Sequence, residues 1–188
     1  MSIKELVKSN RSYRRYDESY DLKRDDLEYL IDLARMTASA ANRQPLKYYL
    51  SNDKETNNKI FETLSWAGYI KDWDEPKKGE RPSGYIVILG DKTISKNYFC
   101  DPGIAAQTIL LGAREKGLGG CIFAAINKEN LRKNLDLPNK FEILYVISLG
   151  NPVEKVVLEE MDDNIKYWRD EDQVHHVPKR SLNKIIIN

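Results

Sequence analysis

The chain has 188 residues, a length typical of one domain whose hydrophobic core needs no disulfide or metal to hold it together. Hydrophobic residues make up 41% of the chain and charged residues 31%, which excludes an intrinsically disordered protein. Thirty basic residues against twenty-nine acidic ones leave a formal charge of +1, so no strong global field would attract nucleic acid or an anionic membrane.

The first half of the chain predicts helices and strands in alternation. The N-terminus lacks the apolar stretch of a signal peptide, so we expect a cytoplasmic protein. Residues 3–8 predict a short helix, and residues 23–36 a longer one because their apolar side chains recur at helical spacing. A strand is expected at 47–51 and another helix at 54–64. Residues 65–84 mix aromatic, proline, glycine and charged residues, which indicates a long irregular segment.

The second half continues this pattern around a helix rich in small residues. Residues 85–90 predict a buried strand, and residues 103–116 a helix that another backbone can approach closely. The glycines of residues 117–120 are typical of a helix end. The remaining predicted elements are a strand at 121–126, a helix at 127–135 capped by Asn127, and a strand at 142–150.

The C-terminal residues differ from the rest. They are polar and predict irregular structure, until an apolar run closes the chain at 184–187. Such a tail is poorly suited to packing on its own core, and a partner subunit could supply the missing contacts. We therefore expect a single domain over residues 1–188, in which residues 151–188 form an extension that reaches the partner.

Several common kinds of site are excluded by the pattern. Cys100 and Cys121 are too few and too far apart for a disulfide framework or a zinc site. No glycine-rich turn follows a strand and opens a helix, which argues against a Rossmann site, and the P-loop pattern is absent. His175 and His176 would point to opposite faces of a strand, so we treat both as structural and assign no metal site. No side chain is assigned a catalytic role.

Three short segments carry candidate binding chemistry. Residues 10–16, NRSYRRY, offer guanidinium groups and a serine hydroxyl suited to phosphate oxygens, but a solvated basic turn has the same composition. Residues 38–45, ASAANRQP, offer amide groups that could bind the polar edge of a heteroaromatic ring, but such a loop is equally common between a helix and a strand. Residues 101–107, DPGIAAQ, belong by periodicity to a core or interface helix.

Together, and in this order, these segments resemble the nitroreductase family. Members carry an RRSxRxF-like segment, a PSAxNxQPW-like segment, and a DxGxAxQ helix that ends in GLGxC. This sequence has NRSYRRY, ASAANRQPL, DPGIAAQ and GLGGCIF in these places, and SLGNP also fits. The resemblance covers residues 3–152. It departs at Asn10, where members usually have arginine, and at Ala38 and Leu46, where they have proline and tryptophan.

The resemblance implies an α+β fold of three layers, with helices flanking a central, mainly antiparallel sheet. It also implies an intertwined homodimer that binds FMN between its subunits. Arg11 and Ser12 would hold phosphate oxygens, and Arg14 would lie near N1 and O2 of the flavin, where a cation stabilises the reduced anion. Backbone groups of Ala124 and Ala125 would face the ring near N5.

Two further groups of residues match flavin contacts of the family. Ser39, Asn42 and Gln44 correspond to positions that approach the flavin, commonly from the other subunit. Lys179 and Arg180 are the candidates for the basic residues that members place on the phosphate from the C-terminal tail. The alternative for these last two is a pair of solvated surface charges.

The implied activity is hydride transfer from NADH or NADPH, through flavin N5, to an electron-poor acceptor such as a nitroaromatic, a quinone or an activated alkene. Tyr69 and Trp73 of the irregular segment could stack on such an acceptor or could simply be packed. Two alternatives stay open. One is a specialised flavin reductive enzyme such as a dehalogenase, and the other is a flavin-binding sensor or storage module.

Overall fold

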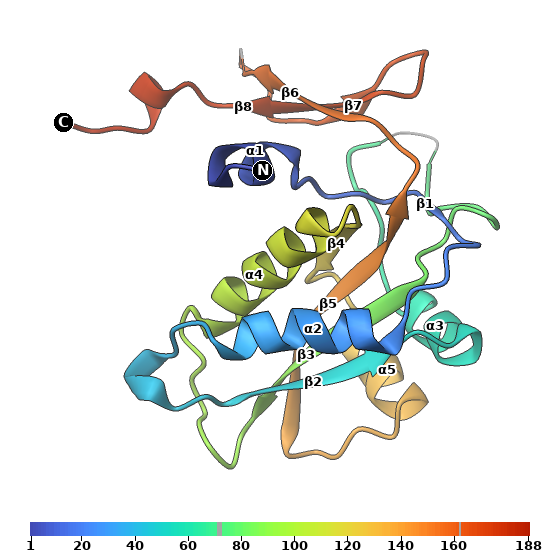
Figure 1. Cartoon of the computed structure of the whole chain (residues 1–188), viewed down its shortest axis with the longest axis vertical. Helices are drawn as coiled ribbons and strands as arrows, with labels where there is room; N and C mark the ends of the chain where they lie inside the picture. The colour runs from blue at the N-terminus through green and yellow to red at the C-terminus, as the bar shows by residue number, and fades with distance from the viewer. Residues whose placement is uncertain (71–72, 162) are drawn as a thin grey trace.

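A five-stranded antiparallel sheet forms the centre of the fold (Figure 1). The computed structural model describes residues 1–70, 73–161 and 163–188. The long strand β5 pairs with β3 along one edge and with both β4 and β1 along the other, and β2 completes the sheet beside β3. The strands are β1 (Tyr16–Asp17), β2 (Leu46–Ser51), β3 (Gly84–Asp91), β4 (Gly119–Phe123) and β5 (Phe141–Pro152).

Helices cover both faces of this sheet, which confirms the predicted three-layer α+β architecture. The helices are α1 (Ile3–Ser9), α2 (Arg24–Arg35), α3 (Lys54–Phe61), α4 (Asp101–Glu115) and α5 (Lys128–Asn134). Alternate residues of β3 enter different cores: Ile86 and Ile88 pack with α2 and α4, whereas Val87 packs with α3 and α5. In the part of the chain that the structure describes, no helix is long and apolar enough to cross a lipid bilayer.

Most predicted elements are confirmed, with changes at their ends. α4 begins at Asp101, before the predicted start, and β4 ends at Phe123, before the predicted end. Gly117 follows α4 with a φ of 82°, the left-handed conformation expected of a glycine at a helix end. Asn127 caps α5 by accepting a hydrogen bond from the Asn130 N–H at 3.1 Å. Within the described residues between α3 and β3 no helix or strand forms, as predicted.

The expectation of an irregular C-terminal tail is wrong. The tail forms a second sheet from β6 (Val156–Glu160), β7 (Trp168–Arg169) and β8 (His175–Lys179), with β6 parallel and β7 antiparallel to β8. This C-terminal sheet lies at one end of the molecule beside α1 (Figure 1). Its strands are short, and β7 has only two residues, so their pairing depends on contacts that no local pattern encodes. After it, Leu182 and residues 185–187 are exposed apolar side chains.

Gly120 of β4 contacts the N-terminal segment through its backbone and packs closely against α4 and β5. Ser12 bridges to Gly120, and the Tyr13 N–H donates a hydrogen bond to the Gly120 carbonyl at 3.0 Å. A Cβ atom at position 120 would lie 2.6 Å from both the Leu110 side chain and the Ser148 carbonyl oxygen. The position therefore has no room for a side chain, which explains one glycine of the GLGG segment by packing alone.

Gly120→Ala should lower the free energy of unfolding by about 1–3 kcal/mol, because the added methyl group meets a backbone carbonyl of β5. Gly103→Ala is the matched control. No atom lies within 4 Å of its added Cβ, and alanine favours the helix by up to about 1 kcal/mol. Urea unfolding followed by circular dichroism measures both variants. Equal free energies of unfolding for the two variants would contradict this account of the packing.

Candidate functional site

A pocket between the N-terminal segment and the C-terminal sheet gathers basic side chains. It has a volume of about 280 Å³, and α4, β4 and β8 contribute to its walls. Arg11, Ser12 and Arg14 line it from the segment that follows α1, and Lys179 lines it from β8. We call it the basic pocket. Three residues that the resemblance assigns to the phosphate, and Arg14, which it assigns to the flavin ring, thus lie around one cavity.

The cations of the basic pocket retain free donors. The Arg11 Nη2 donates to the Val7 carbonyl at 2.8 Å, but the Arg11 Nε is buried without a hydrogen-bond partner. Burial lowers the pKa of Arg11 from its usual value, which marks it as a partly desolvated cation. Within the described residues, the Arg14 guanidinium donates only to the Ser12 carbonyl, at 3.3 Å. Among the described residues, no carboxylate pairs with Arg11, Arg14 or Lys179.

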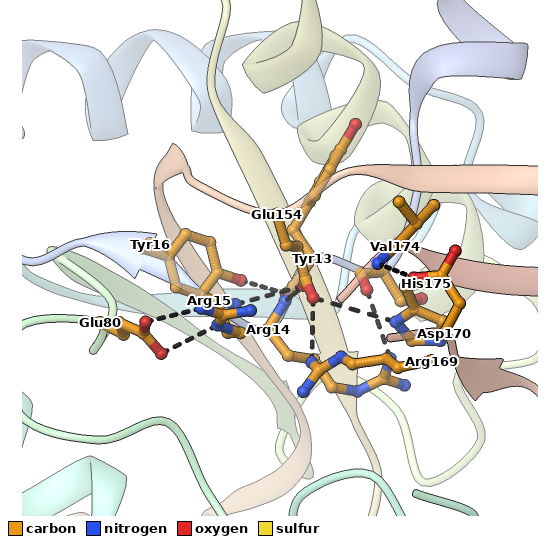
Figure 2. Close-up of polar contacts among 11 residues, drawn as sticks. Tyr13, Arg14, Arg15, Tyr16, Glu80, Glu154, Arg169, Asp170, Val174 and His175 are labelled. Atoms are coloured by element: carbon orange, nitrogen blue, oxygen red, sulfur yellow. Dashed lines mark hydrogen bonds and ion pairs between the residues drawn. The ribbon is translucent and has the colours of Figure 1, made fainter. Parts of the chain in front are cut away.

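Arg15 has a different role from its neighbours. Its guanidinium group forms two hydrogen bonds with the Glu80 carboxylate, at 2.8 and 2.7 Å, as Figure 2 shows. This bidentate ion pair ties the segment to the residues that precede β3. Only two of the three guanidinium groups in NRSYRRY are therefore available to a ligand.

Glu154 fastens the segment to the C-terminal sheet (Figure 2). Its side chain is fully buried, and it accepts hydrogen bonds from the backbone N–H groups of Arg14 and Arg15, the latter at 3.2 Å. The Arg169 Nη2 donates to its other oxygen at 3.0 Å, and the His175 Nδ1 lies 3.9 Å from that oxygen. Burial would raise the pKa of Glu154, but His175, the Arg14 N–H and Arg169 together hold this pKa below its usual value.

The second candidate segment is a strained loop. Ala41, Asn42 and Gln44 have φ angles of 51°, 52° and 49°, in the left-handed region that residues other than glycine seldom adopt. The amide Nε2 of Gln44 donates to the Asn42 side-chain oxygen at 3.0 Å, and both side chains are exposed. Such strain persists only where surrounding contacts hold it, and it is common in binding loops.

Asp101 supplies those contacts from the first residue of α4. Its buried carboxylate accepts hydrogen bonds from the Ser39 hydroxyl at 2.6 Å and from the Ala40 N–H at 3.0 Å. The Ser39 oxygen in turn accepts from the Gln44 N–H at 2.9 Å. Ser39 is thus occupied on both sides by protein groups, and it positions the loop. Asp101 was not among the predicted site residues, although it lies in the quoted DPGIAAQ segment.

One copy of the chain does not bring all the predicted residues together. Ser39 and Gln44 line a separate hollow beside Tyr48, and Ala124 lines a third one beside Phe99. Asn42 and Ala125 are exposed, and the Ala125 carbonyl accepts a hydrogen bond from the Ser65 N–H at 3.1 Å. Arg180 is exposed and does not line the basic pocket, although its neighbour Lys179 does.

The two histidines lie on opposite faces of β8, as predicted. The ring nitrogens of His176 both pair with carboxylates, Nδ1 with Glu159 and Nε2 with Asp170 at 2.9 Å. His175 instead lines the basic pocket, as do Tyr167 and Gln107, and none of these three was predicted as a site residue. Gln107 lies in the DPGIAAQ segment, His175 was treated as structural, and the polar tail gave no signal for Tyr167.

An aromatic cleft adjoins the basic pocket, because Tyr167 lines both. The cleft has a volume of about 590 Å³ and includes Tyr69 and Trp73 of the predicted irregular segment. The Tyr69 and Tyr167 rings are 5.1 Å apart between centroids. Trp73 packs edge-on against Trp66 at 6.4 Å, and the Arg169 guanidinium lies 4.6 Å from its ring centre. Trp73 is thus held by packing, while Tyr69 is 48% exposed.

Comparisons with known proteins match most of the chain. The family model described as "Nitroreductase family" matches residues 7–151. A curated protein of Archaeoglobus fulgidus, with the provisional name NADH dehydrogenase/NAD(P)H nitroreductase, is 26% identical over an aligned length of 166 residues. The alignment covers 84% of this chain and 90% of that protein.

Solved structures share the fold. A nitroreductase family protein of Clostridium difficile 630 is similar with a TM-score of 0.70 at 22% identity, covering 100% of this chain and 98% of its own. An FMN-dependent nitroreductase of Clostridium difficile R20291 is similar with a TM-score of 0.64 at 23% identity, covering 85% of this chain and 90% of its own.

Glu154→Gln should lower the free energy of unfolding at pH 7 by about 3–5 kcal/mol, because it leaves Arg169 buried without its counter-charge. A carboxylate with a depressed folded-state pKa stabilises the protein above its unfolded-state pKa, and that contribution is lost as the pH falls through the folded-state value. The variant should therefore lose stability less steeply than the wild type as the pH falls below 4.5. Urea unfolding between about pH 7 and pH 3 measures this.

The matched control is Glu160→Gln, an exposed glutamate on β6. It should keep both the wild-type stability and the wild-type pH dependence. If Glu154→Gln followed the wild-type acid profile, Glu154 would not be the ionised centre of the cluster.

Proposed function

Because the chain belongs to the nitroreductase family, we propose that it is an FMN-dependent oxidoreductase that takes electrons from NADH or NADPH and passes them to an electron-poor acceptor. The basic pocket carries this proposal. Arg11, Arg14 and Lys179 face one cavity in which the described residues offer them no carboxylate partner. The unpartnered Arg11 Nε is a donor suited to a phosphate oxygen.

Different residues of the basic pocket would contact different parts of FMN. Arg11, Ser12 and Lys179 would hold the phosphate, and Arg14 would stabilise negative charge near N1 and O2 of the ring. FMN, when bound, supplies the hydride-accepting and hydride-donating centre at N5. Lys179 is favoured over Arg180 as the phosphate ligand from the tail, because only Lys179 lines the pocket.

We also propose a homodimer in which the loop of residues 39–44 reaches the flavin of the other copy. Within one copy this loop lines a different hollow from the basic pocket, yet its amides are exposed and its strained backbone is firmly held. Exposed apolar side chains offer an interface: Ile3 and Val7 of α1 and residues 185–187 of the tail are largely uncovered. These last residues would be the part of the 151–188 extension that contacts the partner.

The aromatic cleft is our candidate for the acceptor site. It adjoins the basic pocket through Tyr167, and Tyr69 presents an exposed ring on its wall. Aromatic side chains stack on planar, electron-poor rings. This supports nitroaromatics and quinones as acceptors, and activated alkenes could enter the same space.

Purified protein tests the proposal directly. The expected result is a yellow homodimer that contains FMN, loses its flavin colour with NADH or NADPH under anaerobic conditions, and regains it on addition of a quinone or a nitroaromatic. Protein that cannot be reconstituted with FMN would refute every flavin-based function. Protein that binds FMN but is not reduced by either nicotinamide would favour the sensor or storage alternative.

Arg14→Ala should weaken FMN binding about tenfold and lower the reduction potential of the bound flavin, because a cation near N1 favours the reduced anion. Spectroelectrochemical titration measures the potential. Arg24→Ala, which removes an exposed arginine of α2, is the control and should change neither quantity. An unchanged potential in Arg14→Ala would show that this guanidinium lies away from the ring.

A further inference from the structure

The buried imidazole of His175 distinguishes the basic pocket from a simple cluster of surface cations. His175 is only 1% exposed, and its backbone N–H bonds to the Lys155 carbonyl at 2.8 Å, so its place in β8 is fixed. Its side chain lies on the pocket face of the strand. The neighbouring His176, on the other face, has both ring nitrogens satisfied by carboxylates.

Neither ring nitrogen of His175 has a hydrogen-bond partner in the described part of the protein. Nδ1 lies on the side of Glu154, 3.9 Å from its carboxylate, and the Tyr167 ring packs against the imidazole at 5.2 Å between centroids. A buried polar group without a partner is costly, by about 1–3 kcal/mol. Such a group in a native protein needs an explanation, and a ligand that binds in the adjoining pocket would provide one.

The charges around His175 determine which partner fits. Glu154 is the nearby acid, but its oxygens already accept from two backbone N–H groups and from Arg169. The cations Arg11, Arg14 and Lys179 line the same pocket without a carboxylate partner among the described residues. An imidazole N–H in these surroundings is complementary to an oxyanion with several acceptor atoms.

We propose that His175 is a phosphate-binding residue, whose Nε2–H donates a hydrogen bond to the phosphate group of the flavin nucleotide while Glu154 holds the ring from the Nδ1 side. The identity of the ligand, a flavin nucleotide, rests on the function proposed above. The group that His175 would bind is a phosphate monoester. His175 thereby contributes to the selection of FMN over riboflavin, which has no phosphate.

Nuclear magnetic resonance of the wild-type protein tests this without any substitution, because the chain has two histidines and one of them serves as an internal control. In protein labelled with ¹⁵N in its histidine rings, the ring resonances of His175 should shift when inorganic phosphate or FMN is added, and those of His176 should not. Unchanged His175 resonances at saturating FMN would overturn the proposal.

Substitution gives the second measurement. His175→Gln should weaken FMN binding about tenfold, measured by quenching of flavin fluorescence, and leave riboflavin binding unchanged. His176→Gln is the matched control, one residue along the same strand, and should bind both flavins as the wild type does. An equal loss for FMN and riboflavin in His175→Gln would place the residue away from the phosphate and overturn the proposal.

These outcomes separate the inference from the proposed function. If the wild type binds FMN and the His175 resonances do not respond, the inference fails while the flavin function stands. If the wild type binds no flavin but inorganic phosphate still shifts the His175 resonances, the flavin function fails while the phosphate site stands. If neither ligand has any effect, both are refuted.

Discussion

Glu154 joins the two ends of the chain through a carboxylate that water cannot reach. An ionised group in that position is tolerated only when donors surround it, and here the donors are the backbone N–H groups of Arg14 and Arg15 on one side and the Arg169 guanidinium on the other. Because both sides are needed, the N-terminal segment and the C-terminal sheet are positioned together. The basic pocket lies between them and exists only in that arrangement.

A second buried carboxylate performs the same task at the strained loop. Asp101 binds the backbone and hydroxyl of residues 39–40, and so holds a loop whose left-handed residues would otherwise relax. Both oxygens of Glu154 and both oxygens of Asp101 already accept hydrogen bonds from protein groups, so neither carboxylate is free to bind a ligand. Each lies beside a group of candidate binding residues, and each acts by fixing the backbone from which those residues project.

Local sequence patterns were sufficient to predict most helices and strands of the fold. Helical spacing identified α2 and α4, and a continuous apolar run identified β3, because burial of one face imposes periodicity on the sequence. The C-terminal sheet was missed because its strands are short and lie in a mostly polar stretch of the chain, and a buried glutamate with an arginine, rather than apolar alternation, anchors them. The family resemblance also pointed to four of the residues that line the pocket, the serine Ser12 and the basic residues Arg11, Arg14 and Lys179.

The sequence by itself thus determined the family resemblance, the central elements and the chemical types of the binding residues, since these depend on neighbours in the chain. Only the tertiary structure decided which of these groups are free. The Arg15 guanidinium is paired with Glu80, and the Ser39 hydroxyl donates to Asp101, whereas His175 lines the pocket. The two pairings join residues that lie 65 and 62 positions apart, and no local pattern specifies which donors and acceptors folding will bring within hydrogen-bond distance.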